Sequence, residues 1–255
     1  MLLSLASFLI AAKSGFAETK PLLEDSTYQA DDARQADKDA LACYNRGLAR
    51  GKIGDYRGAI RDYDRAIELN PKYTNAYNNR GDAYGKLGNL HQAIKDYSRA
   101  IELNPKDALT YFARGTAFSD LGDYQRVIGD CDKAIELLPE FALPYYYRGI
   151  AYEKLGDLRQ AIRDYSRTIE LAPKYAKAYA GRGSALGKVG AFQEAVRDCD
   201  KAIQLDPKDA LAYYNRGVAY GKLGDSHREI MDSKTAAQLG FKLAQDFLKS
   251  QGISW

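Results

Sequence analysis

Glycine–lysine pairs and cysteines flanked by aspartates are the places in this sequence where residue types and spacing could do chemistry. A phosphate-binding loop needs the pattern G-x-x-x-x-G-K-[ST], because its backbone amides surround the phosphate. The stretches Gly183–Lys188 and Gly217–Lys222 are one residue short of that pattern and continue with Val189 and Leu223. We therefore expect no phosphate site.

The residue sets needed for metal binding or nucleophilic catalysis are equally hard to find. Residues 130–132 and 198–200 both read Asp-Cys-Asp, but His91 and His227 stand alone, without the spacing of metal ligands. A catalytic centre would also need a nucleophile, a base and a group that orients the base. With 2 His and 3 Cys, the chain offers no such set. We expect a protein that is not an enzyme and that holds no cofactor or metal.

The composition is that of a folded chain with little net charge. Of 255 residues, 45% are hydrophobic and 28% are charged, which excludes disorder, collagen and a polytopic membrane protein. Lys and Arg number 37 against 34 Asp and Glu, so the formal charge of +3 lacks the basic excess usual in nucleic-acid binders. The 20 Tyr and 22 Gly stand out, and their placement explains the architecture.

Three series of residues recur every 34 positions, which indicates one repeating unit. Six glycines and five prolines set the phase, and a second glycine series lies between them: Gly47, Gly81, Gly115, Gly149, Gly183 and Gly217; Pro71, Pro105, Pro139, Pro173 and Pro207; Gly54, Gly88, Gly122, Gly156, Gly190 and Gly224. We number the positions of each repeat from 1 to 34, and the six repeats span 40–73, 74–107, 108–141, 142–175, 176–209 and 210–243.

Each repeat is predicted to form two helices. Apolar and small residues recur at positions 4, 20, 24 and 27, with the spacing of an amphipathic helix. The first helix, helix A, covers roughly positions 1–14 and ends at the glycine of position 15, which accepts a left-handed conformation easily. The second, helix B, covers roughly positions 17–30, because the proline at position 32 cannot continue it. Small residues at positions 8 and 20 let the helices approach, and tyrosines at 4, 11 and 24 fill the wider gaps.

Residues 74–107, TNAYNNRGDAYGKLGNLHQAIKDYSRAIELNPKD, resemble the tetratricopeptide repeat (TPR) family. The resemblance recurs six times over about residues 40–243, and in this repeat it rests on Tyr77, Gly81, Tyr84, Ala93, Tyr97, Ala100 and Pro105. It implies an all-α fold, a right-handed superhelical solenoid of six tandem helix-turn-helix units.

The sixth repeat departs from this pattern, as a terminal repeat that faces water would. The departures stand at Ser226, Glu229, Ser233 and Phe241. The residues that follow, 240–252, read GFKLAQDFLKSQG and are predicted to form a C-terminal capping helix.

The first residues form a segment apart from the repeats. Residues 1–12, MLLSLASFLIAA, make an apolar run of signal-peptide length, too short for a bilayer span of roughly 20 residues. Gly15 and Ala17 supply small residues before a cleavage site after Ala17. We expect a signal-like segment over 1–17, a polar linker or short helix over 18–39, and a location in the bacterial periplasm or envelope. The alternative is a frayed or buried N-terminal helix in a cytoplasmic protein.

Charges of opposite sign recur at positions 7 and 23. Position 7 is Arg and position 23 is Asp in all six repeats: Arg46, Arg80, Arg114, Arg148, Arg182 and Arg216; Asp62, Asp96, Asp130, Asp164, Asp198 and Asp232. We favour a half-buried pair between each Arg and an Asp of its own or the preceding repeat, since a planar guanidinium suits a bidentate contact. The alternative is a local pair between position 23 and the base at position 26, worth about 0.3 kcal/mol.

In the TPR family, helix A lines the concave face, so the resemblance implies that positions 2, 5, 6, 9, 12 and 13 face a groove. Aromatic rings there suit ligand contact, because Tyr is enriched at binding hot spots: Tyr44, Phe112, Tyr146, Tyr147 and Tyr214. Packing is the alternative for the rings at position 5. Asparagines could pair with a peptide backbone, since an amide both donates and accepts: Asn45, Asn78, Asn79 and Asn215.

A stripe of five lysines at position 13 would favour an acidic partner segment: Lys52, Lys86, Lys154, Lys188 and Lys222. The alternative is a solvated face, because exposed charge pairs contribute little. In that case the lysines would be neutralised by the aspartates three residues further on: Asp55, Asp123, Asp157 and Asp225.

Together these features predict a non-enzymatic protein–protein interaction scaffold that binds a protein or peptide segment in its concave groove. The alternatives are a self-associating structural component of an envelope assembly and an accessory subunit of an enzyme complex. We expect neither nucleic-acid binding nor a membrane span, and the oligomeric state is left open.

Overall fold

The computed structural model describes residues 19–255, with side chains from Arg34 onward, and these residues form thirteen α-helices and no strand. The chain divides into two compact parts, here called the N-terminal block, which ends at Leu87, and the C-terminal block, which begins at Gly88. The segment 1–17, expected to be signal-like, lies outside the described residues. None of the described helices is both long and apolar enough to cross a membrane.

The N-terminal block consists of α1 (Thr19–Lys52), α2 (Tyr56–Leu69) and α3 (Thr74–Lys86). The segment 18–39, expected as a linker or a short helix, is helical from Thr19 and continues without a break into helix A of the first repeat. No glycine interrupts residues 19–46, and Pro21 lies in the first turn, where its missing N–H costs no hydrogen bond. The first repeat therefore begins on a helix more than twice as long as the other A helices.

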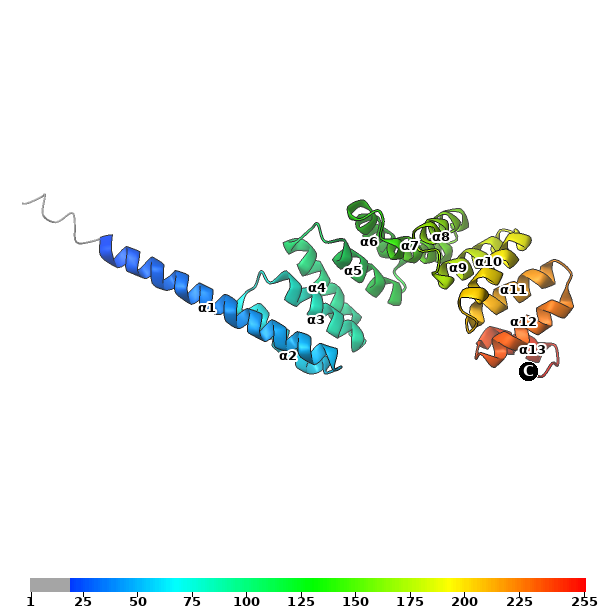
Figure 1. Ribbon diagram of the computed structural model, residues 1–255, viewed down its shortest axis with the longest axis horizontal. Helices are drawn as coiled ribbons and strands as arrows, with labels where there is room; N and C mark the ends of the chain where they lie inside the picture. Colours follow the sequence, from blue (N-terminus) through cyan, green and yellow to red (C-terminus); the bar gives the residue numbers. More distant parts are fainter. Residues whose placement is uncertain (1–18) are drawn as a thin grey trace, which may run out of the picture. The chain divides into compact units, whose positions relative to one another are not determined.

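The C-terminal block contains ten helices that follow one another as pairs (Figure 1). From α4 to α13, each helix packs against the next one along the chain. Helix A covers positions 1–13 or 1–14 and helix B covers 17–30, as predicted, except that helix B of the last repeat ends one residue earlier. The bounds are α4 (Leu90–Leu103), α5 (Ala108–Asp120), α6 (Tyr124–Leu137), α7 (Ala142–Leu155), α8 (Leu158–Leu171), α9 (Ala176–Lys188), α10 (Phe192–Leu205), α11 (Ala210–Lys222), α12 (Ser226–Gln238) and α13 (Lys242–Ser250).

Two residues of the A–B turn determine where helix B begins. The glycine of position 15 has a positive φ in every repeat, for example 89° at Gly156, which residues with a Cβ rarely adopt. The residue after it, where it is Asp, caps helix B by accepting a hydrogen bond from the backbone N–H three residues on: Asp55, Asp123, Asp157 and Asp225. These are the aspartates expected to neutralise the lysines of position 13, and the structure shows them capping helices instead.

One large ring between small residues makes the contact of the fourth repeat with the fifth. The Tyr165 side chain of α8 is 1% exposed and packs with Ala161 and Ala185. It also lies against Gly149 of α7 and Gly181 of α9, where an added Cβ would sit 2.9 Å from the ring at either glycine. Glycine is therefore required at both positions by close approach.

Cysteines replace this tyrosine in the third and fifth repeats. Cys131 and Cys199 are fully buried free thiols, and Cys43 is free and half-buried. Burial raises the pKa of the Cys131 and Cys199 thiols to about 12, so both stay neutral at ordinary pH. In each Asp-Cys-Asp cluster the cysteine is thus a core residue, as the repeat pattern predicts. The first aspartate, Asp130 or Asp198, is also buried, whereas the second, Asp132 or Asp200, is exposed.

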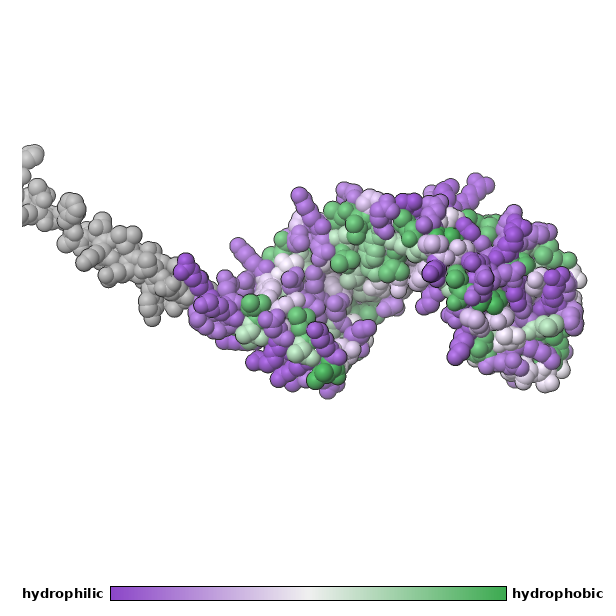
Figure 2. Space-filling view, in the orientation of Figure 1, coloured by the Kyte–Doolittle hydropathy of each residue, from purple (hydrophilic) through white to green (hydrophobic). Residues whose placement is uncertain are grey.

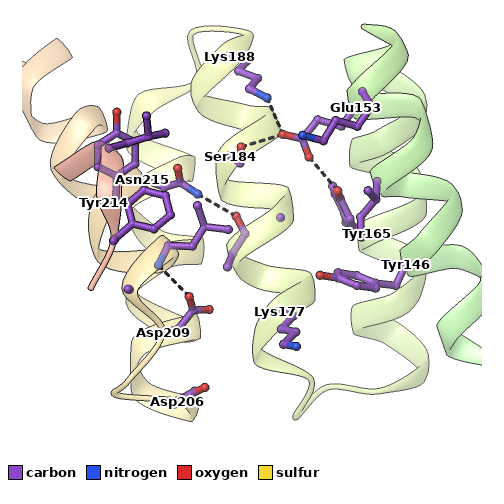
Figure 3. A pocket seen from close by; sticks show the side chains of 18 of the residues that line it. Tyr146, Glu153, Tyr165, Lys177, Ser184, Lys188, Asp206, Asp209, Tyr214 and Asn215 are labelled. Carbon is purple, nitrogen blue, oxygen red and sulfur yellow. Dashed lines mark hydrogen bonds and ion pairs between the residues drawn. The ribbon is translucent and has the colours of Figure 1, made fainter. Parts of the chain in front are cut away.

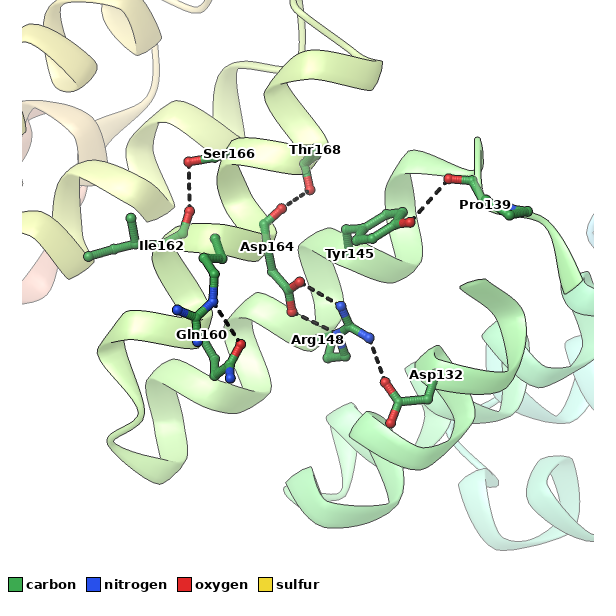
Figure 4. Close-up of polar contacts among 10 residues, drawn as sticks. Asp132, Pro139, Tyr145, Arg148, Gln160, Ile162, Asp164, Ser166 and Thr168 are labelled. Atoms are coloured by element: carbon green, nitrogen blue, oxygen red, sulfur yellow. Dashed lines mark hydrogen bonds and ion pairs between the residues drawn. The ribbon is translucent and has the colours of Figure 1, made fainter. Parts of the chain in front are cut away.

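Position-7 arginines join helix A to helix B of the same repeat. Arg148 on α7 donates two hydrogen bonds to the Asp164 carboxylate on α8, at 2.8 and 2.7 Å (Figure 4). The same contact recurs in the pairs Arg46 with Asp62, Arg114 with Asp130, Arg182 with Asp198 and Arg216 with Asp232. The interhelix interpretation is confirmed for these five repeats. In the first four repeats the base at position 26 pairs instead with Glu at position 29, as Lys133 does with Glu136 at 2.6 Å.

The same guanidinium groups also reach back to helix B of the preceding repeat. Arg148 donates to the Asp132 carboxylate at 2.5 Å, in addition to its bonds with Asp164. Asp and Ser alternate at this acceptor, position 25: Asp64 accepts from Arg80, Ser98 from Arg114, Asp132 from Arg148, Ser166 from Arg182 and Asp200 from Arg216. The Asp132 side chain is 51% exposed and the Asp164 side chain only 7%, so the pair with Asp164 is the one largely removed from water.

Replacing Arg148 with Leu, or Asp164 with Asn, should lower the free energy of unfolding by about 2–4 kcal/mol, because each change leaves a mostly buried partner without its counterion. The double variant should lose less than the sum of the two, since neither charge then stands alone. Denaturant melts of the full chain measure these values.

The control for this comparison of single and double variants is the exposed pair of Lys133 and Glu136, whose side chains are 55% and 66% exposed. Lys133→Leu and Glu136→Gln should each change stability by less than about 0.5 kcal/mol. If Arg148→Leu and Asp164→Asn both melted like the unaltered protein, the interhelix pair would be shown to hold nothing together.

Candidate functional site

A cavity of 770 Å³ lies between α7, α9 and α11, the A helices of the fourth, fifth and sixth repeats (Figure 3). Tyr165 of α8 also lines it, as do Phe241 and Leu243 at the start of α13. This volume is within the range of about 300–1,000 Å³ that is usual for ligand pockets. The cavity is therefore the main candidate binding site of the C-terminal block.

The cavity exists because α9 presents small residues where its neighbours present large ones. Ala180 and Gly181 occupy positions 5 and 6 of α9, whereas Tyr146 of α7 and Tyr214 of α11 occupy position 5 on either side. Tyr165 lies under Gly181, where its ring fills the space that a Cβ would take. The result is an apolar floor with an aromatic residue on each flanking helix.

Glu153 is the polar centre of the cavity wall. Its carboxylate accepts hydrogen bonds from the Tyr165 hydroxyl (2.8 Å), the Ser184 hydroxyl (2.8 Å) and the Lys188 ammonium (2.7 Å), so it joins α7, α8 and α9 (Figure 3). Burial and the charge of Glu153 raise the pKa of Tyr165, which keeps the phenol protonated as a donor. Sequence reasoning missed Glu153, although position 12 is Gly or Ser in the other five repeats.

The other carboxylates of the cavity accept hydrogen bonds from backbone N–H groups, whereas several of its lysines form no ion pair. Asp209 accepts hydrogen bonds from two backbone N–H groups at the start of α11, and Asp206 accepts one from the N–H of Lys208 (3.0 Å). Within the described residues, Lys154, Lys177 and Lys208 form no ion pair. The cavity mouth can therefore supply cationic partners to a ligand.

A second cavity, of 280 Å³, lies among α1, α2 and α3 in the N-terminal block. Lys52, Lys86 and Asn79 line it, together with Asp82 and Tyr63. Burial raises the pKa of Tyr63 to about 12, so its phenol stays neutral. Both lysines and a carboxylate therefore line this smaller cavity.

The aromatic rings predicted to contact a ligand are held in place by packing. Each ring at position 5 lies beside a second ring near the end of its own repeat: Tyr44 by Tyr73 (4.9 Å between centroids), Phe112 by Phe141 (5.0 Å), Tyr146 by Tyr175 (5.1 Å) and Tyr214 by Phe241 (5.0 Å). Tyr147 meets Phe112 and Tyr146 edge-on. Of the five predicted rings, Tyr146 and Tyr214 line the larger cavity, and ligand contact by all five stays a prediction.

The predicted asparagines have separate surroundings. Asn79 donates to the Tyr44 hydroxyl (3.0 Å), so its amide is engaged within the N-terminal block. Asn215 lines the larger cavity, with its amide nitrogen 3.5 Å from a backbone carbonyl of α9. Asn45 is exposed and Asn78 is half-buried, and peptide pairing by either stays a prediction.

The five lysines of position 13 also differ in their surroundings: Lys154 and Lys188 line the larger cavity, Lys52 and Lys86 line the smaller one, and Lys222 is exposed at the end of α11. Lys188 is committed to Glu153. Two cavity lysines stand outside the predicted stripe, Lys177 at position 2 and Lys208 at position 33. The loop before α11 supplies Lys208, and helix periodicity alone says nothing about a loop residue.

Apolar surface gathers over α5, α6 and α7 of the C-terminal block, in contrast to the mostly hydrophilic surface around it (Figure 2). Leu109 of α5, for example, is 60% exposed.

In the part of the chain that the structure describes, no group of three His, Cys, Asp or Glu side chains is placed to hold a metal ion. The larger cavity offers apolar and aromatic surface, a buried carboxylate with three donors, and lysines at its mouth. That combination suits recognition of a side chain and its charged neighbours.

Family comparisons agree with the repeat geometry. A tetratricopeptide repeat model matches residues 74–107 and 142–175, a TPR repeat model matches 47–88 and 188–224, and another tetratricopeptide repeat model matches 97–128. The chain belongs to the tetratricopeptide repeat family, whose fold is a general protein–protein interaction module. No curated protein matches it.

Several solved structures share the fold. The crystal structure of MamA is 28% identical, covering 68% of this chain and 94% of its own, with a TM-score of 0.63. YrrB, described as a TPR protein with an unusual peptide-binding site, is 24% identical over 73% of this chain and 97% of its own, with a TM-score of 0.61. PilF of Pseudomonas aeruginosa is 15% identical over 85% and 99%, with a TM-score of 0.72. The last two likenesses show the fold alone.

Gly181→Ala should lower the free energy of unfolding by about 1–3 kcal/mol, because the new Cβ would lie 2.9 Å from the Tyr165 ring and displace it. The matched control is Gly129→Ala on α6, where an added Cβ meets nothing within 4 Å. That change should raise stability by about 0.5–1 kcal/mol, since Ala is the better helix former. Thermal melts compare the two, and a Gly181→Ala variant as stable as the control would refute the close contact beneath the cavity floor.

Proposed function

We propose that this protein is a non-enzymatic scaffold that binds an extended segment of a partner protein along its A helices. The cavity between α7, α9 and α11 is the principal contact. The observation that carries the proposal is the hollow over Ala180 and Gly181, which lies between Tyr146 and Tyr214. A groove of this kind accepts a protruding side chain, while the flanking helices contact the chain on either side.

Membership of the TPR family supports this function, because the fold is a general protein–protein interaction module. YrrB, which shares the fold, is a TPR protein with a peptide-binding site. The cavity itself supports a role without catalysis. Its lining contains no His, and the Ser184 hydroxyl donates to a carboxylate that two other donors already hold.

An acidic partner segment fits the charges at the cavity mouth. Lys154, Lys177 and Lys208 have no ion-pair partner within the described residues, whereas the cavity carboxylates already accept hydrogen bonds. Carboxylates of a partner would find these ammonium groups available. Such charge complementarity raises association rates and specificity more than it raises affinity.

Site-specific photocrosslinking in the native cell tests this proposal. Leu211 at the cavity and Leu138 after α6 are similarly exposed, at 41% and 44%, and each is replaced in turn by photoreactive benzoylphenylalanine. We expect a discrete covalent adduct with a partner protein from position 211 and none from position 138, because only the first lies in the cavity.

Equal adducts from both positions, or none from either, would contradict binding at the cavity. An adduct whose mass is that of two copies of this chain would favour the self-associating alternative instead. Melts of both variants show whether each remains folded.

We further propose that the protein is exported to the periplasm or envelope of a bacterium, on the strength of the apolar run at residues 1–12 and the small residues before position 18. Cell fractionation followed by mass spectrometry of the N-terminus should find a chain that starts at Glu18 outside the cytoplasm. An intact chain that starts at Met1 in the cytoplasmic fraction would contradict export.

A further inference from the structure

The floor of the larger cavity has no unmet hydrogen-bonding demand. Its two hydroxyl groups, on Tyr165 and Ser184, both donate to Glu153, and Lys188 supplies the third donor to the same carboxylate (Figure 3). A buried polar group left without a partner would penalise an apolar occupant, and both of these hydroxyl groups have one. The floor therefore suits an apolar side chain better than a polar one.

The walls are rigid aromatic surfaces. The Tyr146 ring meets Tyr147 and Tyr175 edge-on, with interplanar angles of 88° in both contacts, so its orientation is fixed by its neighbours. Across the hollow, the Tyr214 ring packs on Phe241. Aromatic rings favour offset or edge-to-face contact with one another, so a ring inserted between these walls would find preferred geometry.

Two lysines without an ion pair stand at the mouth of the cavity. Lys177 lies in the first turn of α9 and Lys208 precedes α11, while Ala180 and Gly181 lie one turn further along α9. Both lysines are exposed and carry no ion pair within the described residues. A ring seated over Gly181 would therefore bring the residues beside it in its chain next to ammonium groups.

We infer that this cavity takes a single aromatic side chain of a partner segment, with acidic residues immediately beside it. The inference rests on the proposed function and specifies the kind of segment that the scaffold selects. It requires both elements: the ring for the hollow over α9, and the carboxylates for the lysines around it.

Blocked peptides of the form GDEDXDEDG, with X as Phe, Leu or Ala, test this inference by fluorescence anisotropy with the full chain. We expect the Phe peptide to bind at least about tenfold more tightly than the Ala peptide, because a fully buried Phe side chain is worth that much or more. The Leu peptide should lie between them. Equal binding of the Phe and Ala peptides would overturn the anchor, and Leu binding as tightly as Phe would overturn its aromatic character.

Two pairs of variants locate the effect. Ser184→Leu fills the floor and should abolish the preference for Phe over Ala, whereas Thr116→Leu, at the same repeat position on α5, should leave it intact. Lys208→Glu should weaken the Phe peptide by about threefold to tenfold, and Lys106→Glu, at the same repeat position outside the cavity lining, should not. Because Lys208 is exposed, its variant gives a result even if Ser184→Leu proves unstable.

The two proposals fail in different ways. If no peptide binds but crosslinking from position 211 still captures a partner, the inference is overturned and the scaffold function stands. If the peptides bind and the preference for Phe survives in Ser184→Leu, the ring is seated elsewhere and the inference is again overturned. Loss of both peptide binding and crosslinking would remove the proposed function as well.

Discussion

The arginine at position 7 is the contact on which the architecture depends. In the fourth repeat, Arg148 binds Asp164 of its own helix B and Asp132 of the preceding one, so one side chain holds three helices. Only a planar group with several donors can serve two carboxylates in this geometry, and a lysine ammonium could not replace it. Gly149 follows directly in sequence and lets Tyr165 approach the same helix. The spacing of successive helix pairs is therefore set by a polar contact and a packing contact at adjacent positions.

The candidate site arises where one repeat lacks the aromatic pair at positions 5 and 34. In the first, third and fourth repeats, an aromatic residue at position 5 is matched by an aromatic residue at position 34, and the two rings pack. In the fifth repeat, position 5 is Ala180 and position 34 is Asp209, which caps α11 instead. The missing pair of rings leaves the hollow. Glu153, standing where other repeats have Gly or Ser, then links the helices around the hollow through Tyr165, Ser184 and Lys188.

Sequence periodicity predicted the fold well and the site only in part. Helix bounds, the glycines at position 15 and the pairing of Arg148 with Asp164 follow from residues that recur, because recurrence reports what every repeat needs. The site depends on residues that do not recur. Nothing in the 34-residue period indicates that Tyr165 lies beneath Gly181 or that Glu153 joins α7, α8 and α9. Those contacts depend on how side chains from different helices meet. The distance between facing side chains is set by helix crossing angles and side-chain sizes rather than by spacing along the chain.

From the second repeat onward the helix pairs keep the same bounds to within one residue, and the hollow results from two small residues on one helix, Ala180 and Gly181. The consequence is that a recess can change in one repeat at a time. A different position along the array could acquire a comparable recess by exchanging a few helix-A side chains and the cap residue that follows, without altering helix lengths or turns. Gene duplication within such an array copies the scaffold and the recess together, after which each copy is free to diverge in what it recognises. Gly181 serves both packing and recognition, because it admits the Tyr165 ring on one side and leaves the recess open on the other.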